Sequence, residues 1–253
     1  MVGRPEGFRE GSGNPAFDAA RLLRQKLELN RGFGWDMPVG SISRAPEPEQ
    51  PEEVEELAET PGEDGDRQAA LAAVNAEVVD CTLCGLCEGR TRTVFGVGNA
   101  SARILFVGEG PGRDEDLAGE PFVGRAGKLL DKIIQAMGLA REDVYIANIV
   151  KCRPPENRNP ASEEMAACFP YLERQMRIIK PDVICALGGV AAKALLSTDL
   201  SVGRLRGQFH EYAGVPVRVT YHPAYLLRSP GEKKKTWEDI KAVMAHVGMD
   251  VPG

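Results

Sequence analysis

Four short apolar runs between residues 104 and 220 have the pattern of strands that are buried on both faces. Each is rich in Ile, Val and Leu, and each is followed closely by glycine, proline or a polar side chain. The runs are Ile104–Val107, Val144–Val150, Val183–Leu187 and Val215–Thr220. Nearly continuous apolar strands are typical of parallel sheets that carry helices on both faces.

The segments around these runs have helical patterns. Leu129, Leu130, Ile133 and Ile134 recur on one side of a predicted helix, and Ser162 begins another with acidic residues in its first turn. The predicted helices are Ala69–Val79, Gly124–Met137, Ser162–Ile179, Val190–Leu196 and Lys234–Val247. This alternation predicts an α/β protein, a three-layer α/β/α sandwich around a central, mainly parallel four-stranded sheet.

The N-terminal part of the chain has a different composition. A short amphipathic helix is predicted at Phe17–Asn30, and from Ser43 to Asp66 the chain is rich in proline and glutamate. Such a segment buries too little apolar surface to offset the entropy of ordering it. We therefore expect an N-terminal extension at 1–42, an acidic disordered linker at 43–75 and a folded domain at 76–253.

Charge follows the same division. Residues 1–80 carry 8 Lys+Arg against 17 Asp+Glu, a net charge of −9. Residues 81–253 carry the remaining 23 Lys+Arg and 20 Asp+Glu, a net charge of +3. A mildly basic domain permits binding to a polyanion without requiring it.

The expected cellular compartment bears on how the cysteines are used. The first thirty residues lack a secretory signal, and no apolar run is long enough to span a membrane, so we expect a cytoplasmic protein. In a reducing compartment, cysteines are more often metal ligands, catalytic thiols or core residues than disulfides.

The spacing of the six cysteines predicts a metal site. Cys81 and Cys84 form a C-x2-C pair and Cys87 follows at the same interval, whereas Cys152 and Cys168 lie far downstream. Such thiols bind zinc or an iron–sulfur cluster, and spacing leaves both open. Cys185 lies within an apolar run and is predicted to be a core residue.

Other candidate residues follow the predicted strands. Gly108-Glu109-Gly110-Pro111-Gly112 is a glycine-rich turn that can bind phosphate or simply join a strand to a helix. Phe122 can fill a local core or stack on a base. Asn148 can cap a strand or bind the edge of a base, and His222 lies at a strand end where ligand sites are expected.

Four motifs, in order, carry a resemblance to a known family. They are Gly108–Gly112 with Glu115-Asp116, Gly119-Glu120-Pro121-Phe122-Val123-Gly124-Arg125-Ala126-Gly127, Asn148-Ile149-Val150-Lys151-Cys152-Arg153-Pro154-Pro155, and His222-Pro223-Ala224-Tyr225-Leu226-Leu227-Arg228. Together with the cysteines they resemble the family 4, iron–sulfur type, uracil-DNA glycosylases over about residues 76–247. These enzymes remove uracil from DNA and leave an abasic site, the first step of base-excision repair.

The resemblance implies a 4Fe-4S cluster. By it, Cys81, Cys84, Cys152 and Cys168 would be the ligands, whereas Cys87 and Cys185 would be additional cysteines. Cysteine spacing alone also allows an electron-transfer or redox-sensing module, and the motifs also allow a nucleic-acid-binding protein that has lost catalysis.

The resemblance also assigns roles in the base pocket. His222 would hydrogen-bond uracil O2, Asn148 would bind the O4/N3 edge, and Phe122 would stack on the extruded base. Gly108, Glu109 and Gly110 would line the pocket. The best-known branch of the superfamily has Asp at the position of Gly110, so Glu109 is our candidate for positioning water.

Contacts to DNA are expected on the rim of this pocket. Leu227 would fill the gap left by base flipping, and Arg228 would contact phosphate. Lys151, Arg153 and Arg158 are further candidate phosphate contacts. Related enzymes with the same fold join uracil covalently through a basic, histidine-containing insertion after the second strand. The corresponding segment here, Arg153–Pro160, is rich in proline and asparagine and has no histidine, so a free abasic product is expected. The expected partner is uracil-containing DNA, single- or double-stranded, bound by a monomer at the nucleoid of a bacterial-type cytoplasm.

Overall fold

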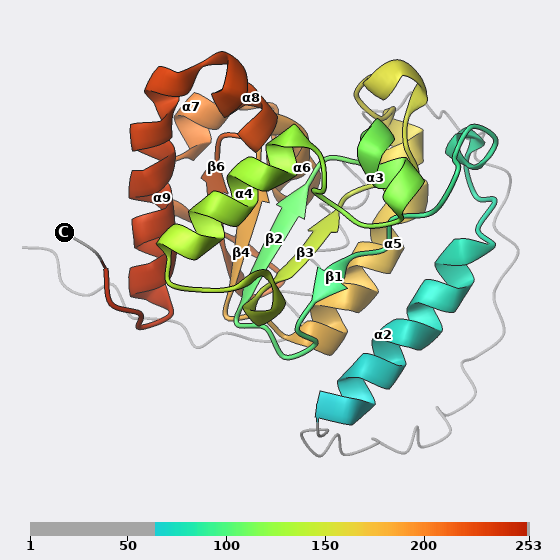
Figure 1. The fold of residues 1–253 in the computed structure, drawn as a ribbon, viewed down its shortest axis with the longest axis horizontal. Helices are drawn as coiled ribbons and strands as arrows, with labels where there is room; N and C mark the ends of the chain where they lie inside the picture. Colours follow the sequence, from blue (N-terminus) through green and yellow to red (C-terminus); the bar gives the residue numbers. More distant parts are fainter. Residues whose placement is uncertain (1–63, 252–253) are drawn as a thin grey trace, which may run out of the picture. The chain divides into compact units, whose positions relative to one another are not determined.

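A computed structural model describes residues 64–251 as a six-stranded mixed sheet between helices (Figure 1). The strand order is β1-β3-β2-β4-β6-β5. The strands are β1 (Val97–Gly98), β2 (Ile104–Gly108), β3 (Tyr145–Asn148), β4 (Val183–Leu187), β5 (Phe209–Tyr212) and β6 (Val215–Thr220). The pairs β2–β3, β2–β4 and β4–β6 are parallel, so the expected parallel core is confirmed.

The expected number of four strands was wrong, because an antiparallel strand lies at each edge of the sheet. Strand β1 has only two residues. Strand β5 alternates exposed and partly buried residues, so it lacks the apolar run that marks the central strands. A two-residue turn joins β5 to β6, with positive φ at Ala213 (49°) and Gly214 (82°). That dihedral pattern matches the tight turns of hairpins.

The helices agree with expectation in most of their positions. The α-helices are α2 (Asp64–Val79), α3 (Arg113–Ala118), α4 (Arg125–Ala136), α5 (Ser162–Ile179), α6 (Gly189–Leu196), α7 (Val202–Leu205), α8 (Pro223–Arg228) and α9 (Lys233–His246). The 3-10 turns are Gly85–Cys87, Arg141–Asp143, Pro155–Asn157 and Pro230–Glu232. The short helices α3, α7 and α8 were not expected.

The expected linker boundary requires a correction. Because α2 begins at Asp64, residues 64–75 are helical, although they were assigned to the linker. Leu71, Val74 and Val78 on this helix are buried and join the core, which explains why it is ordered. The helix expected at Phe17–Asn30 and the linker up to residue 63 lie outside the described residues.

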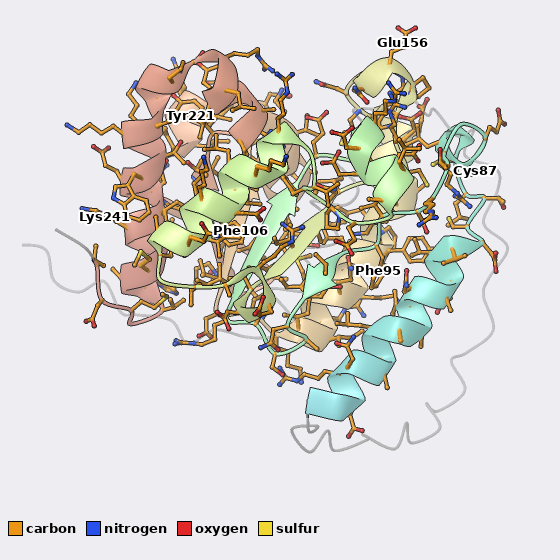
Figure 2. All side chains as sticks on the ribbon, viewed as in Figure 1. Cys87, Phe95, Phe106, Glu156, Tyr221 and Lys241 are labelled. Carbon is orange, nitrogen blue, oxygen red and sulfur yellow. The ribbon has the colours of Figure 1, made fainter. Side chains whose placement is uncertain are left out.

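Two apolar cores lie on the two faces of the sheet and define the three layers. Alternate residues of β2 point to opposite faces: Leu105 and Val107 pack in the core beneath α2, α5 and α6, whereas Ile104 and Phe106 pack beneath α4 and α9. Phe106 is labelled in Figure 2 on this second face. The three-layer α/β/α sandwich is therefore confirmed. Within residues 64–251, no helix is long and apolar enough to cross a membrane.

The parallel strands place their carboxyl ends along one edge of the sheet. Gly108 at the end of β2 lies opposite Asn148 at the end of β3. Strand β6 ends at Thr220, two residues before His222. Gly188, after β4, has a φ of 92°, and a Cβ there would lie 2.9 Å from the His222 Cβ. The fold thus gathers the loops that carry the candidate residues.

Candidate active site

A cavity of about 440 Å³ opens at this edge of the sheet. Its lining brings together Glu109, Gly110, Phe122, Asn148, His222 and Arg228, which the sequence placed in four separate motifs. Further lining residues were not singled out by the sequence for this cavity, among them Asn157, Ala224 and Tyr225.

Phe122 lines one wall of the cavity and packs closely on Gly108, which was expected to line the pocket but is not among its lining residues. Phe122 is 5% exposed and has a positive φ of 55°, which is costly for a residue with a side chain. A Cβ on Gly108 would lie 2.5 Å from Phe122 Cζ and 2.4 Å from Asn148 Oδ1. A Cβ on Gly127 would lie 1.8 Å from the Phe122 carbonyl oxygen. Gly108 is therefore required by the position of the Phe122 ring, and Gly127 by the position of the Phe122 backbone.

Asn148 also lines the cavity and has an unpaired amide oxygen. Its side chain is 1% exposed, and Oδ1 has no hydrogen-bond partner among the described residues. An unpaired buried acceptor costs roughly 1–3 kcal/mol, so such a group is usually completed by a ligand. The amide can accept one hydrogen bond and donate another, which suits the edge of a base.

His222 is held as a neutral imidazole. It precedes helix α8, and its Nδ1 accepts a hydrogen bond from the Ala224 backbone N–H at 3.1 Å. Burial, helped by the nearby charge of Arg228 and opposed by that of Glu115, lowers the pKa of His222 to about 4. With Nδ1 accepting, the proton of the neutral ring lies on Nε2. The ring lies 5.5 Å from that of Phe122, at an angle of 31°.

Two carboxylates in the glycine-rich loop region have different surroundings. Burial raises the pKa of Glu109 above its ordinary value. Glu115 instead accepts hydrogen bonds from the backbone N–H groups of Gly112, Val123 and Gly124 at 2.9–3.1 Å. Glu115 thereby ties the glycine-rich loop to the loop that carries Phe122. Glu115 stands three residues after Gly112, the spacing of a capping box at a helix start, and this spacing accounts only for its bond to Gly112.

Lys151 was expected at the rim of the site, and this was wrong. The side chain is 1% exposed, and Nζ donates to the backbone oxygen of Asn148 at 2.8 Å and to Gln175 Oε1 at 2.6 Å. It cannot contact phosphate, because internal acceptors already hold it. Arg153 and Arg158 do reach the surface, where they bond Asn157 Oδ1 and the Glu164 carboxylate respectively.

A second cavity of about 410 Å³ adjoins the first. It is lined by Leu227, which is 44% exposed, and by Arg113 and Arg125. Arg228 and Ala224 line both cavities. An exposed apolar side chain flanked by guanidinium groups suits contact with a nucleic acid.

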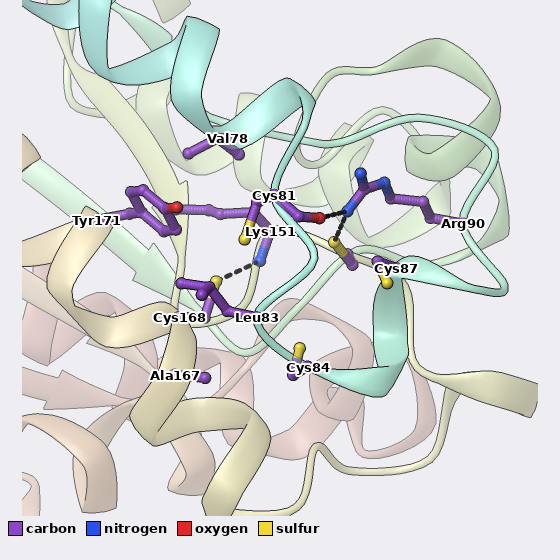
Figure 3. Close-up of a pocket in the computed structure, with 11 residues that line it drawn as sticks. Val78, Cys81, Leu83, Cys84, Cys87, Arg90, Lys151, Ala167, Cys168 and Tyr171 are labelled. Carbon is purple, nitrogen blue, oxygen red and sulfur yellow. Dashed lines mark hydrogen bonds between the residues drawn. The ribbon is translucent and has the colours of Figure 1, made fainter.

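The three closely spaced cysteines at 81–87 and the two cysteines that follow β3 meet in a separate pocket (Figure 3). It is lined by Cys81, Cys84, Cys87, Cys152 and Cys168. In the arrangement of residues 64–251, no group of three or more His, Cys, Asp or Glu side chains meets the geometry of a metal site. Cys185 lies elsewhere, fully buried in β4.

The donor chemistry of this pocket nevertheless fits a thiolate-bound group. Arg90 Nη1 donates to Cys152 Sγ at 3.3 Å, and the Lys151 backbone N–H donates to Cys168 Sγ at 3.2 Å. Hydrogen bonds from N–H groups to sulfur are among the features that tune iron–sulfur clusters.

Comparison with known proteins shows the family to which the chain belongs. Residues 95–241 match the family model of the uracil DNA glycosylase superfamily, which defines the class. A type-4 uracil-DNA glycosylase of Archaeoglobus fulgidus is 46% identical over 184 residues, 70% of this chain and 92% of that protein. One from Thermotoga maritima is 47% identical over 174 residues, 67% of this chain and 91% of that protein. The chain therefore belongs to the type-4 uracil-DNA glycosylases.

Proposed function

We propose that the protein hydrolyses the N-glycosidic bond of a deoxyuridine extruded from DNA, releases uracil and leaves an abasic site that enters base-excision repair. The observation that carries this proposal is the buried, unpaired amide oxygen of Asn148 in the same cavity as the neutral ring of His222. A redox module or a noncatalytic DNA-binding protein would have no use for that pair.

The Asn148 amide selects the base. Its Oδ1 accepts from uracil N3–H while its Nδ2 donates to uracil O4. Cytosine has an acceptor where uracil has its N3–H donor, and an amine donor where uracil has its O4 acceptor. Cytosine would leave the buried Oδ1 unpaired. Phe122 offers its ring to the extruded base, and Gly108, which has no side chain, leaves room for the Phe122 ring and the Asn148 amide to lie close together.

His222 stabilises the leaving group. As the N1–C1′ bond breaks, its electron pair moves onto uracil, and the negative charge is shared with O2. The Nε2–H of neutral His222 donates to that oxygen, in a site where few waters compete. The neutral ring can donate in this way because its Nδ1 accepts from Ala224, which leaves the proton on Nε2.

Glu109 is the proposed water-positioning group. Water adds to C1′ of the oxocarbenium-like sugar, and its proton passes to the Glu109 carboxylate. The pKa of Glu109, raised by burial, makes it a better proton acceptor than an exposed glutamate. The charge of the departing uracil anion is neutralised by a proton from solvent.

Contacts outside the pocket hold the DNA. Leu227 would occupy the gap left by the extruded base, and Arg228 would contact a phosphate on the border of both cavities. The protein would act as a monomer at the nucleoid, where its substrate lies, and would release a free abasic product.

The cysteine pocket is the proposed site of a 4Fe-4S cluster. Cys81, Cys84, Cys152 and Cys168 would hold it, with Cys87 and Cys185 as additional cysteines. Such a cluster would join the segment before β1 to the loop after β3, which is a structural role. Cys81→Ser should lower iron well below about four atoms per chain, whereas the matched core substitution Cys185→Ser should not. Full iron content in Cys81→Ser would exclude that ligand.

The function is tested by measuring free bases. Single strands that carry one uracil, cytosine or thymine are incubated with the protein, and the released base is measured by mass spectrometry. Release of uracil alone is expected. Equal release of cytosine would contradict the role given to Asn148.

A further inference from the structure

A column of three stacked side chains stands beside the uracil cavity. The rings of Tyr221 and Tyr225 are stacked, with centroids 5.1 Å apart and an interplanar angle of 28°. The guanidinium carbon of Arg206 lies 5.9 Å from the centre of the Tyr221 ring. Tyr221, which is labelled in Figure 2, therefore contacts both of the other side chains, Arg206 and Tyr225.

The column is anchored at its Arg206 end. Arg206 Nε donates to Asp239 Oδ2 at 2.9 Å, and Nη2 donates to the Lys235 backbone oxygen at 2.6 Å. Asp239 is fully buried and also accepts from Arg218 and from the Thr220 hydroxyl. The orientation of Tyr225 is therefore set by a fixed stack, and little side-chain entropy remains to be lost when a ligand binds.

The other end of the column, Tyr225, lies at the base cavity. Tyr225 is 38% exposed and lines the same cavity as Asn148 and His222. Leu227, two residues further along α8, lines the neighbouring cavity instead. Residues two apart on a helix point to nearly opposite sides. Helix α8 thus presents the Tyr225 ring to the base cavity and the aliphatic side chain of Leu227 to the neighbouring cavity.

We propose that Tyr225 is a stacking subsite for the nucleobase next to the extruded uracil. This inference rests on the proposed function and extends it to a second base. Aromatic rings stack on any base, because every base has a π-face, so the subsite tolerates any neighbouring sequence. In a duplex, that neighbour is already stacked and paired. The subsite therefore favours single-stranded DNA, whose bases reach Tyr225 without further unpairing.

The test combines a protein change with a DNA change. Uracil release is measured on single strands in which the base on the 5′ or 3′ side of uracil is present or is replaced by a baseless tetrahydrofuran residue. For the wild type, removing the neighbour on one side should lower kcat/KM about tenfold. Tyr225→Leu should lose about the same factor on the natural strand and lose nothing more on the baseless one.

Two variants and a duplex measurement complete the design. Tyr225→Phe keeps the ring and should behave as the wild type. Phe209→Leu removes an aromatic ring of matched exposure, 39%, outside the cavity, and should leave kcat/KM unchanged. The ratio of single-strand to duplex activity should fall in Tyr225→Leu alone.

The outcomes separate this inference from the proposed function. The subsite is excluded if Tyr225→Leu has the wild-type kcat/KM on natural strands. It is also excluded if the loss in kcat/KM from Tyr225→Leu multiplies with the loss from removing the neighbouring base. In both cases the proposed uracil release is unaffected. If Tyr225→Leu releases uracil from the baseless-neighbour strands at the same rate as the wild type, the variant is folded. If the wild type releases no uracil from any strand, the proposed function itself fails.

Discussion

Lys151 Nζ donates a hydrogen bond to the backbone oxygen of Asn148 at 2.8 Å, while the Lys151 backbone N–H donates to Cys168 Sγ at 3.2 Å. One buried residue thus contacts both the base pocket and the cysteine pocket. Gln175 Oε1 completes the bonding of Nζ, and Gln175 Nε2 donates to the Phe95 carbonyl oxygen. The backbone of Asn148 is held by a network that reaches the cysteines.

Lys151→Met should therefore impair both stability and catalysis. The change leaves the Asn148 oxygen and Gln175 Oε1 without their donor, at a cost of about 2 kcal/mol in the free energy of unfolding. Because Asn148 loses a contact that fixes its backbone, kcat should fall even where the variant is folded. Thermal unfolding and steady-state kinetics check this, with the exposed Lys128→Met on α4 as the control. A folded variant with the wild-type kcat would contradict the positioning role.

Asn148→Ala should abolish base selection with little effect on DNA binding. Removing a preorganised hydrogen-bonding group of this kind typically costs on the order of 10²–10³-fold in rate. Uracil release and the affinity for a uracil-containing strand are measured side by side. Equal losses in both would mean that Asn148 acts on binding in general.

Gly108→Ala should close the base pocket. The new Cβ would lie 2.4 Å from Asn148 Oδ1 and 2.5 Å from Phe122 Cζ, so at least one of these groups must move. Overpacking of this kind costs about 1–3 kcal/mol, and here the displaced groups bind the base. Uracil release should drop by more than tenfold. Gly231→Ala, where a Cβ meets nothing within 4 Å, should leave the rate unchanged.

The pH dependence should report Glu109 and not His222. Burial and the nearby charge of Arg228 lower the pKa of His222 from 6.5 to about 4, so the ring is already neutral at pH 6 and needs no deprotonation. Burial raises the pKa of Glu109, and the active form is the carboxylate. The rate should therefore fall on acidification through the raised pKa of Glu109, with no inflection near 6.5. Glu109→Gln should be slow and lack that inflection, and near-normal cleavage by this variant would end the role proposed for Glu109.

Much of the fold could be read from local patterns. The expected bounds of α5, β4 and β6 coincide with those of the structure, because each has a strong apolar period and clear end signals. Edge strand β5 was missed because half of its residues are exposed and its neighbours in the sheet, not its own composition, make it a strand.

The candidate site was predictable only in part, for a related reason. Glycines, an amide and a histidine at strand ends point to a ligand edge, and the fold does bring these residues into one cavity. Lys151 and Glu115 could not be placed in this way. A lysine is ordinarily exposed, and only the positions of Asn148 and Gln175 make its burial favourable. Glu115 gains its role from three backbone N–H groups that no sequence pattern brings together.

The central claim is that this cavity removes uracil from DNA. The most direct measurement uses two single-stranded oligonucleotides that are identical except for one uracil in place of thymine. After incubation with the iron-loaded protein, each strand is treated with alkali, which breaks DNA at abasic sites. We predict scission at the position of uracil and none in the thymine strand. An intact uracil strand, with the cysteine pocket fully loaded, would contradict the account.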